Sequence, residues 1–349
     1  RDIQTLLDTI REHSPDEDLS FVSKAYEMAC RAHENQKRLS GEPYIIHPLE
    51  VAIILAKLKL DTATIAAALL HDTVEDTGIT LELIRNEFSD DVALLVDGVT
   101  KISSIKNRSK ATAQAETLRK MLMATIKDVR VILIKLADKL HNMRTLMFQP
   151  EDKQQRIARE TMEIYAPMAR RLGMSQISSE LEDLAFRVLY PDDFDHIDEM
   201  LNQRRVELED YVNNIRATLQ EKLKDLGIEC EITGRAKHYW SIFKKMKQQN
   251  KTFDEIYDIR AVRVITREIK DCYGILGVIH TLWSPIASRF KDYIAVPKSN
   301  LYRSLHTTVI GPGGYPLEVQ IRTREMHVTN EMGIAAHWLY KDHPTPSRR

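Results

Sequence analysis

Two histidines and several acids stand in apolar surroundings in the first half of the 349-residue chain. His47 follows Tyr-Ile-Ile and precedes a proline, so it is expected where a loop enters a helix. His71 and Asp72 form the HD pair of LLHDTVED, and Asp138 interrupts the apolar run of KLADKLHNM. A buried carboxylate without a partner is costly, so a bound cation is the simplest explanation for these acids.

Two imidazoles and two carboxylates form a mixed nitrogen and oxygen donor set. Such a set suits manganese or a similar divalent ion better than structural zinc, which favours thiolates. A divalent ion makes bound water more acidic and polarises a phosphoryl oxygen. The run LLHDTVED predicts one helix in which Glu75 lies one turn after His71, and Asp76 one turn after Asp72. These acids could move protons or hold the water, so the first half predicts metal-dependent hydrolysis of a phosphate ester.

The second half contains a basic region with interleaved aromatic residues. Between Cys230 and Ile310 there are 14 Lys and Arg residues against 7 Asp and Glu residues. Cations for phosphates and rings for a base are what a nucleotide needs, although RNA binding would use the same ingredients. Asp258 and Glu318 fall within the expected sheet of this region, where they could hold Mg²⁺ for phosphoryl-type transfer. The alternative for Glu318 is the solvent-exposed face of an ordinary strand. No GxxxxGK[ST] sequence occurs, which excludes a P-loop enzyme.

Two different patterns of elements must position these residues. Up to about Arg205, apolar residues recur at helical spacing, with breaks at Ser14-Pro15, Gly41-Glu42-Pro43, Thr77-Gly78, Gln149-Pro150 and Tyr190-Pro191. A long charged helix is expected from roughly Phe194 to Leu226, capped by Gly227. IRAVRVIT and YPLEVQIRT then predict strands, and SIFKKMK and YGILGVIHTLW predict further helices of this half. The fold class is therefore α+β, with an all-α region before a mixed or antiparallel sheet.

Composition excludes several other classes of protein. The chain is 43% hydrophobic and 29% charged with a net charge of -1, which fits a soluble globular protein rather than a disordered one. The three cysteines form no CxxC pair, which fits a reducing compartment such as the cytoplasm. The most apolar stretch, from Val51 to Leu70, carries charges, so no membrane association is expected. The start without methionine and the polar PTPSRR end suggest a fragment of a longer protein.

Three runs in the first half, RLSGEPYIIHPLEVA, LLHDTVEDT and LADKLHNMRTL, resemble the HD-type hydrolase domain of the RelA/SpoT homologue proteins. Those proteins make and degrade the bacterial alarmones ppGpp and pppGpp. The Mn²⁺ ligands that the resemblance implies are His47, His71, Asp72 and Asp138. It further implies that Glu75 and Asp76 are the catalytic acids, that Arg38 packs on guanine, and that Asn142 contacts the nucleotide. Leu39 departs from the basic residue often found in the family.

The resemblance continues through GRAKHYWSIFKKM, YDIRAVRVI, RFKDYIAVPKSN, YRSLHTTV, EVQIRT and GIAAHW. These runs are similar to the alarmone synthetase domain, which transfers pyrophosphate from ATP to the 3′-hydroxyl of GDP or GTP. The resemblance implies that Asp258 and Glu318 hold Mg²⁺, that Glu318 helps activate the hydroxyl, and that Tyr302 stacks on guanine. The implied ATP contacts are Arg235, Lys237 and Ser241, and the implied acceptor contacts are Lys291, Lys298, Asn300 and His306. Leu301 and Arg303 replace a glycine and a glutamine often found there.

By this resemblance the chain is a bifunctional catalytic half. An HD-type hydrolase domain is expected over residues 1–150, connecting helices over 151–200, and a nucleotidyltransferase-like synthetase domain over 201–349. The RFKD run is similar to that of bifunctional members. The implied partners are ATP, GDP or GTP, and (p)ppGpp. Ribosome and tRNA contacts are expected only through a carboxyl-terminal regulatory region that this sequence does not contain.

Two alternatives stay open. In one, only the hydrolase works and the second domain senses a nucleotide, which the Leu301 and Arg303 changes would favour. In the other, the chain is a non-enzymatic RNA-binding module. A further hypothesis concerns the helices between about Glu151 and Leu226. Because two opposed reactions running together would consume ATP for no net signal, these helices would form a two-state coupler that favours one site at a time.

Overall fold

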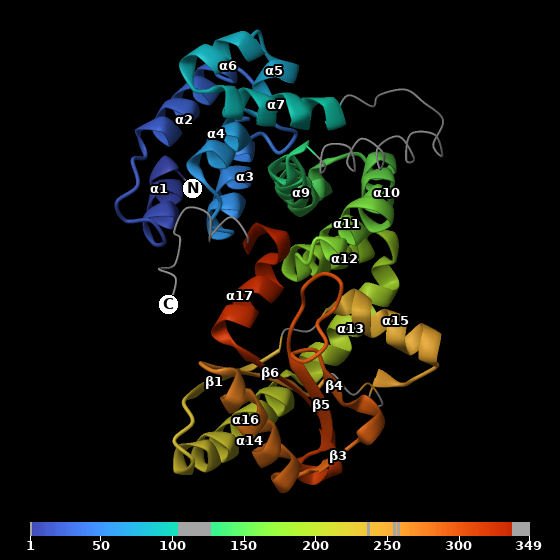
Figure 1. Ribbon diagram of the computed structural model, residues 1–349. Helices are drawn as coiled ribbons and strands as arrows, with labels where there is room; N and C mark the ends of the chain where they lie inside the picture. Colours follow the sequence, from blue (N-terminus) through green and yellow to red (C-terminus); the bar gives the residue numbers. More distant parts are fainter. Residues whose placement is uncertain (1, 104–126, 236–237, 254–255, 257–258, 337–349) are drawn as a thin grey trace. The chain divides into compact units, whose positions relative to one another are not determined.

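The computed structural model describes residues 2–103, 127–235, 238–253, 256 and 259–336, and the chain forms two compact units (Figure 1). We call Arg1–Ala169 with Ile334–Arg349 the helical unit, and Arg170–Gly333 the sheet unit. The division falls inside the range 151–200, where connecting helices were expected. Two of the expected site residues, Lys237 and Asp258, lie outside the described residues.

Helices make up most of the described residues of the helical unit, as the apolar periodicity predicted. They are α1 (Ile3–Arg11), α2 (Ser20–Ala32), α3 (Ile46–Lys57), α4 (Thr62–Leu70), α5 (Thr73–Asp76), α6 (Leu81–Glu87), α7 (Asp90–Ser103), α9 (Val129–Arg144), the 3₁₀ helix η1 (Leu146–Phe148), α10 (Glu151–Glu160), the π-helix η2 (Thr161–Tyr165) and α11 (Ala166–Arg171), which runs across the boundary. The expected breaks are confirmed at Gly41, with φ of +88°, and at Pro150, which precedes α10.

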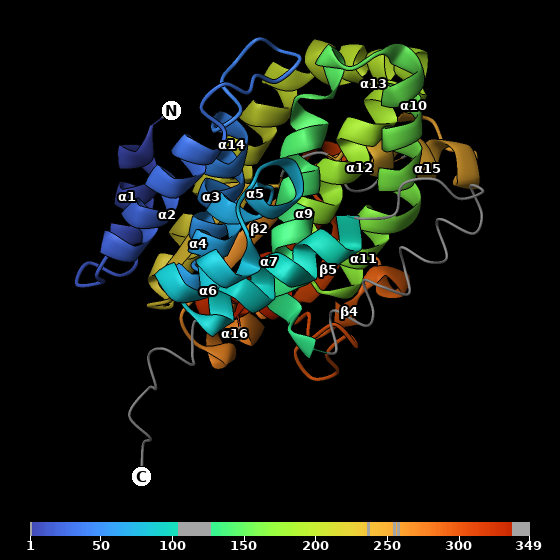
Figure 2. The same ribbon diagram turned by 90° about the horizontal axis from the view of Figure 1, so that it is seen from above.

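Helices α3, α4 and α9 form the centre of the helical unit. Every residue of α3 from His47 to Ala56 is buried, so this helix must be covered on all sides. It packs against α1, α4 and α9, and α4 packs in turn against α2 and α7 (Figure 2). Gly98 on α7 allows a close approach to α9, because a Cβ atom at Gly98 would lie 2.7 Å from Val131 Cγ2. The helices that carry the candidate ligands are therefore tightly packed.

The sheet unit combines further helices with one mixed sheet. Its elements are α12 (Ser175–Leu189), α13 (Pro191–Gln203), α14 (Arg205–Asp225), β1 (Cys230–Gly234), α15 (Tyr239–Gln249), β2 (Ala261–Thr266), α16 (Ile269–Leu282), β3 (Ser284–Pro285), η4 (Ala287–Arg289), β4 (Lys291–Asp292), β5 (Leu305–Ile310), η5 (Pro312–Gly314), β6 (Pro316–Thr323), α17 (Arg324–Met332) and η6 (Gly333–Ala335), the last of which extends past the unit's end. The strand order is β1-β2-β6-β5-β3, with β4 also paired to β5. Among the strands that the structure describes, only β2 and β6 pair in parallel, so the expected mixed sheet is confirmed.

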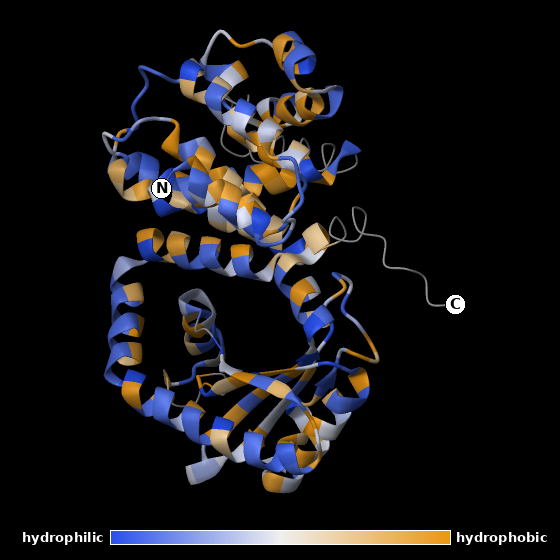
Figure 3. Ribbon diagram, turned by 90° about the vertical axis from the view of Figure 1, so that its left-hand side faces the viewer, coloured by the Kyte–Doolittle hydropathy of each residue, from blue (hydrophilic) through white to orange (hydrophobic). Residues whose placement is uncertain are grey.

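One face of the sheet carries the core of its unit. Leu317, Val319 and Ile321 of β6 are fully buried in a cluster with residues of α14 and α16. In Figure 3 apolar and polar residues alternate along the helices of this unit, as amphipathic packing on a sheet requires. Gly227 ends α14 as predicted, with φ of +68° and the hydrogen bond from Ile228 N to Leu223 O that closes such a cap. No helix among the described residues is long and apolar enough to cross a bilayer.

The structure corrects two expected helices. The charged stretch from Phe194 to Leu226 is not one helix, because α13 ends at Gln203 and α14 begins at Arg205. The two parts have different partners, since α13 packs on α12 and α15 whereas α14 packs on β1 and α16. The run LLHDTVED is also broken, between α4 and α5, at His71 and Asp72.

Hydrogen bonds explain the break in LLHDTVED. His71 Nδ1 lies 2.7 Å from Ala68 O, and Thr73 Oγ1 donates to Leu70 O at 2.7 Å. Side chains thus form hydrogen bonds with two of the last carbonyl groups of α4, and the helix ends there. Glu75 and Asp76 consequently lie on the short helix α5, rather than forming stripes with His71 and Asp72 on a single helix.

Candidate metal centre and nucleotide site

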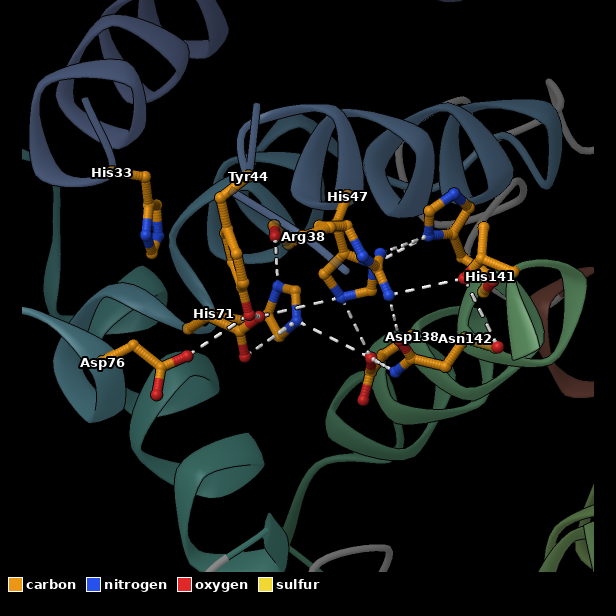
Figure 4. A network of polar contacts seen from close by, with 12 residues as sticks. His33, Arg38, Tyr44, His47, His71, Asp76, Asp138, His141 and Asn142 are labelled. Carbon is orange, nitrogen blue, oxygen red and sulfur yellow. Dashed lines mark hydrogen bonds and ion pairs between the residues drawn. The ribbon is translucent and has the colours of Figure 1, made fainter. Parts of the chain in front are cut away.

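Four side chains from three parts of the helical unit converge on one point. Figure 4 shows three of them, His47, His71 and Asp138. His47 lies in the first turn of α3, His71 and Asp72 lie at the α4–α5 break, and Asp138 lies in the middle of α9. His47 and His71 are each 2% exposed, so both imidazoles are held in the protein interior. The packing of α3 against α4 and α9 brings these positions together.

The distances among these side chains are short enough for them to share one cation. His47, His71 and Asp138 each offer a ligand atom within 4.8 Å of the others. His47 Nε2 lies 3.2 Å from Asp138 Oδ1, and His71 Nε2 lies 3.2 Å from Asp72 Oδ1. His47 Nε2 is 3.7 Å from Asp72 Oδ2, so the second carboxylate borders the same space. All four predicted ligands are therefore together.

His71 supplies the observation that tests whether these residues fit a metal. Its Nδ1 lies 2.7 Å from the Ala68 carbonyl oxygen, which can only accept, so the ring proton is on Nδ1. Its Nε2 is buried and has no hydrogen-bond partner among the described residues. Metal-binding histidines typically have one ring nitrogen, here Nδ1, held by a hydrogen bond while the other, here Nε2, keeps a free lone pair for the metal. The donor set of two imidazoles and two carboxylates therefore fits a divalent cation.

The two carboxylates are held ionised. Burial opposes ionisation of Asp138, but Lys135 and the two histidines hold its pKa well below the usual value. Lys135 Nζ donates to Asp138 Oδ2 at 2.7 Å, which leaves Oδ1 directed at the histidines. For Asp72, burial likewise raises the pKa, and His71 and His47 outweigh it and lower the pKa overall. Burial lowers the pKa of His47, so its imidazole is neutral and able to bind a cation.

Tyr44 connects the ligands to the acidic pair. Its hydroxyl donates to Asp72 Oδ2 at 2.7 Å and lies 3.2 Å from Asp76 Oδ2. Burial, and then the charge of Asp72, raise the pKa of Tyr44, so the hydroxyl keeps its proton. Glu75 and Asp76 are exposed, which places Asp76 at the rim of the centre in contact with solvent.

Arg38 and Asn142 lie next to the same ligands. Arg38 Nη2 donates to Asn142 Oδ1 at 2.8 Å, and Asn142 Nδ2 donates to Asp138 Oδ1 at 2.6 Å. Arg38 Nη1 also lies 3.1 Å from His141 Nδ1, which in turn lies 2.7 Å from His47 Nδ1. Burial, followed by the charges of His47 and Arg38, lowers the pKa of His141 to about 3.

Sequence reasoning missed Tyr44, Lys135 and His141. The signal for two of them was present in KLADKLHNM, because Lys135 and His141 lie three residues before and after Asp138 and share its side of a helix. Tyr44 gave no periodic signal, since it lies in the turn before α3.

A second polar cluster lies in the sheet unit, along β6. Glu318, Gln320 and Arg322 alternate with the core residues, but they are not the solvent-exposed face of an ordinary strand. Gln320 is 3% exposed and Arg322 is 1% exposed. Arg235 Nη1 donates to Glu318 Oε1 at 2.8 Å, and Gln320 Nε2 donates to the same oxygen at 3.0 Å. A buried row that mixes cations with one carboxylate is suited to charged ligands rather than to packing.

Tyr302 and His306 belong to this cluster. The Tyr302 hydroxyl accepts from Arg322 Nη2 at 3.0 Å and lies 2.7 Å from His306 Nε2. Burial, then the charges of Arg322 and Arg235, lower the pKa of His306 to about 3, so its neutral ring accepts a hydrogen bond from the Tyr302 hydroxyl. Lys298 Nζ lies 5.1 Å from the centre of the Tyr302 ring. The expected guanine-stacking residue is therefore surrounded by cations.

The remaining expected contacts are more dispersed. Lys291 is exposed on β4, in register with His306 of β5. Asn300 Oδ1 accepts from Tyr302 N at 3.3 Å, in the turn that leads to the tyrosine. Ser241 lies in the first turn of α15. The assignment of these three residues to a phosphate site stays a prediction.

The aromatic residues before Ser241 are largely occupied by packing. Tyr239 stacks on Phe194 with ring centres 4.6 Å apart, and Trp240 stacks on Tyr190 and Phe243. These two rings therefore join α15 to α12 and α13.

Two known protein families match separate parts of the chain. Residues 25–175 match the family described as "HD domain", and residues 234–345 match the "Region found in RelA / SpoT proteins". Over 97% of its length the chain is 52% identical to the "Bifunctional (p)ppGpp synthase/hydrolase RelA" of Mycobacterium tuberculosis. It is 49% identical, again over 97%, to the "Bifunctional (p)ppGpp synthase/hydrolase SpoT" of Escherichia coli K12. The chain belongs to the RelA/SpoT family.

The chain spans less than half the length of these RelA/SpoT relatives, 46% of the first and 48% of the second. Among solved structures, a metazoan SpoT orthologue described as hydrolysing ppGpp is 28% identical with a TM-score of 0.42, covering 49% of this chain and 96% of its own. The small alarmone synthetase 1 of Bacillus subtilis bound to pppGpp is 21% identical with a TM-score of 0.31, covering 43% of this chain and 84% of its own. As a member of the RelA/SpoT family, the chain carries its HD match mainly in the helical unit's sequence and its RelA/SpoT match mainly in the sheet unit's.

Proposed function

We propose that this chain catalyses two opposed reactions of guanine alarmones. The helical unit would hydrolyse (p)ppGpp, adding water and releasing pyrophosphate from the 3′-oxygen to give GDP or GTP. The sheet unit would transfer pyrophosphate from ATP to the 3′-hydroxyl of GDP or GTP, releasing AMP. The observation that carries the proposal is the convergence of His47, His71 and Asp138 in a family whose relatives bear names for both activities.

For the hydrolase, we assign Mn²⁺ to His47, His71, Asp72 and Asp138. When bound, the ion supplies a more acidic water and polarises a phosphoryl oxygen. Asp138 presents one oxygen because Lys135 holds the other, and Tyr44 fixes the orientation of Asp72. Asp76, at the rim and linked through Tyr44, is placed to accept or return a proton, together with Glu75. Arg38 and Asn142 are assigned to the nucleotide.

For the synthetase, we assign Mg²⁺ to Glu318 together with Asp258. Arg235, with Lys237 and Ser241, would bind ATP, and Arg235 already lies against Glu318. Tyr302 would stack on guanine, beside the acceptor contacts Lys291, Lys298, Asn300 and His306. Catalysis in such a site is positioning and charge stabilisation, which the buried cations of the Glu318 row can supply. We place the enzyme in the cytoplasm, where ATP and GTP are available, and its three cysteines are free in the structure.

Two matched variants test the proposal. Asp72→Asn should abolish Mn²⁺-dependent hydrolysis of ppGpp and leave synthesis from ATP and GDP intact. Glu318→Gln should abolish synthesis of ppGpp from ATP and GDP and leave Mn²⁺-dependent hydrolysis intact. Metal-stripped protein should lose hydrolysis and regain it with Mn²⁺. Hydrolysis that is unaffected by stripping would refute the metal assignment.

A hydrolase with a nucleotide-sensing sheet unit is the second candidate. Arg235 and Gln320 both donate to Glu318 Oε1, so the oxygen assigned to Mg²⁺ is engaged by protein groups. Incubation of the wild-type chain with ATP, GDP and Mg²⁺ decides between the candidates. Formation of ppGpp supports the bifunctional enzyme, and its absence, with hydrolysis intact, supports the sensor. Loss of both activities alongside RNA binding would favour the non-enzymatic alternative.

A further inference from the structure

One arginine reaches two metal ligands through two neighbouring residues of α9. Arg38 Nη1 lies 3.1 Å from His141 Nδ1, and His141 Nδ1 lies 2.7 Å from His47 Nδ1. Arg38 Nη2 donates to Asn142 Oδ1 at 2.8 Å, and Asn142 Nδ2 donates to Asp138 Oδ1 at 2.6 Å. The guanidinium therefore begins two hydrogen-bonded chains, one to each ligand (Figure 4).

The first chain fixes the position of a proton. A guanidinium can only donate hydrogen bonds, so His141 Nδ1 must be an acceptor and carries no proton. His47 Nδ1, which lies 2.7 Å from the same atom, must then be a donor, and the single lone pair of His141 Nδ1 is shared between His47 and Arg38. A neutral imidazole with its proton on Nδ1 has a lone pair on Nε2, the atom that lies 3.2 Å from Asp138 Oδ1 at the metal centre.

Without Arg38 the opposite arrangement would be favoured. The carboxylates of Asp138 and Asp72 both lie within 4 Å of His47 Nε2 and would attract a proton to that atom. His141 could then donate from Nδ1 to His47 Nδ1. His47 would present N–H to the centre, where a cation needs a lone pair. Arg38 therefore determines whether His47 Nε2 presents a lone pair, which can bind a cation, or an N–H group, which cannot.

The second chain fixes an amide. Because Arg38 donates to Asn142 Oδ1, the amide nitrogen of Asn142 must face Asp138. Lys135 holds the other oxygen of Asp138, so both oxygens are oriented before any cation binds. His141 is 6% exposed, which keeps water from substituting for these partners.

We infer that Arg38 is a positioning residue of the metal centre, acting through His141 on His47 and through Asn142 on Asp138. This role is distinct from its assigned contact with the guanine base. It rests on the proposed function in one respect, namely that His47 is a metal ligand. It requires no nucleotide, so it can be measured on the protein alone.

The test uses ¹⁵N-histidine NMR of the full chain without metal, together with calorimetric titration of Mn²⁺. In the wild type, His47 should carry its proton on Nδ1 and His141 on Nε2. His141→Leu removes the acceptor, whereas His141→Asn keeps an acceptor oxygen near the position of Nδ1. Arg38→Met removes the donors, whereas Arg38→Lys keeps a group that only donates. Arg85→Met is the control, because it removes one exposed cation of the same unit, paired with Asp90.

His141→Leu and Arg38→Met should each weaken Mn²⁺ binding by about 10- to 100-fold, the usual effect of losing a partner that orients a ligand. In Arg38→Met the proton of His47 should also move to Nε2. His141→Asn, Arg38→Lys and Arg85→Met should retain most of the affinity. Circular dichroism identifies any variant that fails to fold, and the two conservative variants then still test the inference, because loss of affinity in both would contradict it.

The outcomes separate the inference from the proposed function. If the wild-type chain binds no Mn²⁺, the metal-dependent hydrolase proposal fails. If the wild type binds Mn²⁺ and Arg38→Met binds it equally well with the His47 proton unmoved, the positioning role fails and the metal centre stands.

Discussion

Leu301 occupies a backbone conformation that favours glycine. Its φ is +66°, and its amide donates to Lys298 O at 2.9 Å in the turn before Tyr302. Left-handed backbone costs an L-residue about 1–2 kcal/mol, whereas glycine costs about 0.5–1 kcal/mol through its unfolded-state entropy. Leu301→Gly should therefore stabilise the sheet unit by about 0.5–1 kcal/mol relative to Leu301→Ala, which keeps the strain and likewise removes the half-exposed side chain. Urea unfolding measures the difference, and a less stable glycine variant would contradict the argument.

His306 predicts a pH dependence of stability. Its pKa is lowered to about 3 in the folded protein, first by burial, so the unfolded chain takes up a proton more readily as the pH falls below about 6.5. The contribution of His306 to the free energy of unfolding is thus fully present above pH 6.5 and is lost as the pH falls toward 3. Between pH 7 and pH 5 the loss should be about 2 kcal/mol. His306→Asn should flatten this dependence by that amount in urea unfolding at the two pH values; an unchanged slope would show that the ring is protonated in the fold.

At the scale of elements, the break between α4 and α5 orients His71 and Asp72. Thr73 is fully buried, and its hydroxyl donates to Leu70 O at the point where α4 ends. Thr73→Val keeps the shape but leaves that carbonyl without its partner, so we expect a loss of about 1–3 kcal/mol. Mn²⁺ affinity should fall as well, because His71 is the C-cap of α4 and Asp72 the N-cap of α5.

Thr100→Val is the matched control for this prediction. Thr100 also donates to a backbone carbonyl, Val96 O, at 2.9 Å, but within the continuous helix α7. Thr100→Val should lose less stability than Thr73→Val and should leave Mn²⁺ binding unchanged. Equal effects of the two variants on metal affinity would show that the break does not position the ligands.

These elements also show how far sequence reasoning reached. Apolar periodicity was sufficient for α3, α4 and α9, and the residue types of His47, His71 and Asp138 were sufficient to predict a metal centre. Periodicity did not reveal the break in LLHDTVED, because that break depends on side-chain hydrogen bonds rather than on glycine or proline. It could not show the split at Arg204 either, since only the different partners of α13 and α14 require it.

The burial of Arg322 and Gln320 could not be predicted from the sequence either. Alternation along β6 distinguishes two faces of a strand, but it does not say whether the polar face meets water or a second layer of protein. Their burial follows from tertiary contacts such as the hydrogen bond from Arg322 to Tyr302. The polar site on the sheet is therefore a property of the folded unit.

At the scale of the whole molecule, the two proposed activities would oppose each other. One site would make what the other destroys, and ATP would be consumed without a net product. Coupling of the two sites by helices between about Glu151 and Leu226 stays a hypothesis. A coupling free energy of about 1–3 kcal/mol, typical of such systems, corresponds to an effect of about 5- to 150-fold.

Glu318→Gln allows this coupling to be measured, because ppGpp hydrolysis can then be followed without resynthesis. A non-hydrolysable ATP analogue is the suitable ligand, since GDP would also compete as a product at the hydrolase centre. Hydrolysis should slow at least about 5-fold at saturating analogue if occupancy of the sheet unit biases a two-state coupler. Arg235→Met in the same background removes a proposed ATP contact, so it should shift this inhibition to higher analogue concentrations. A hydrolysis rate that does not change with the analogue, while calorimetry shows that the analogue binds, would mean that the two sites work independently.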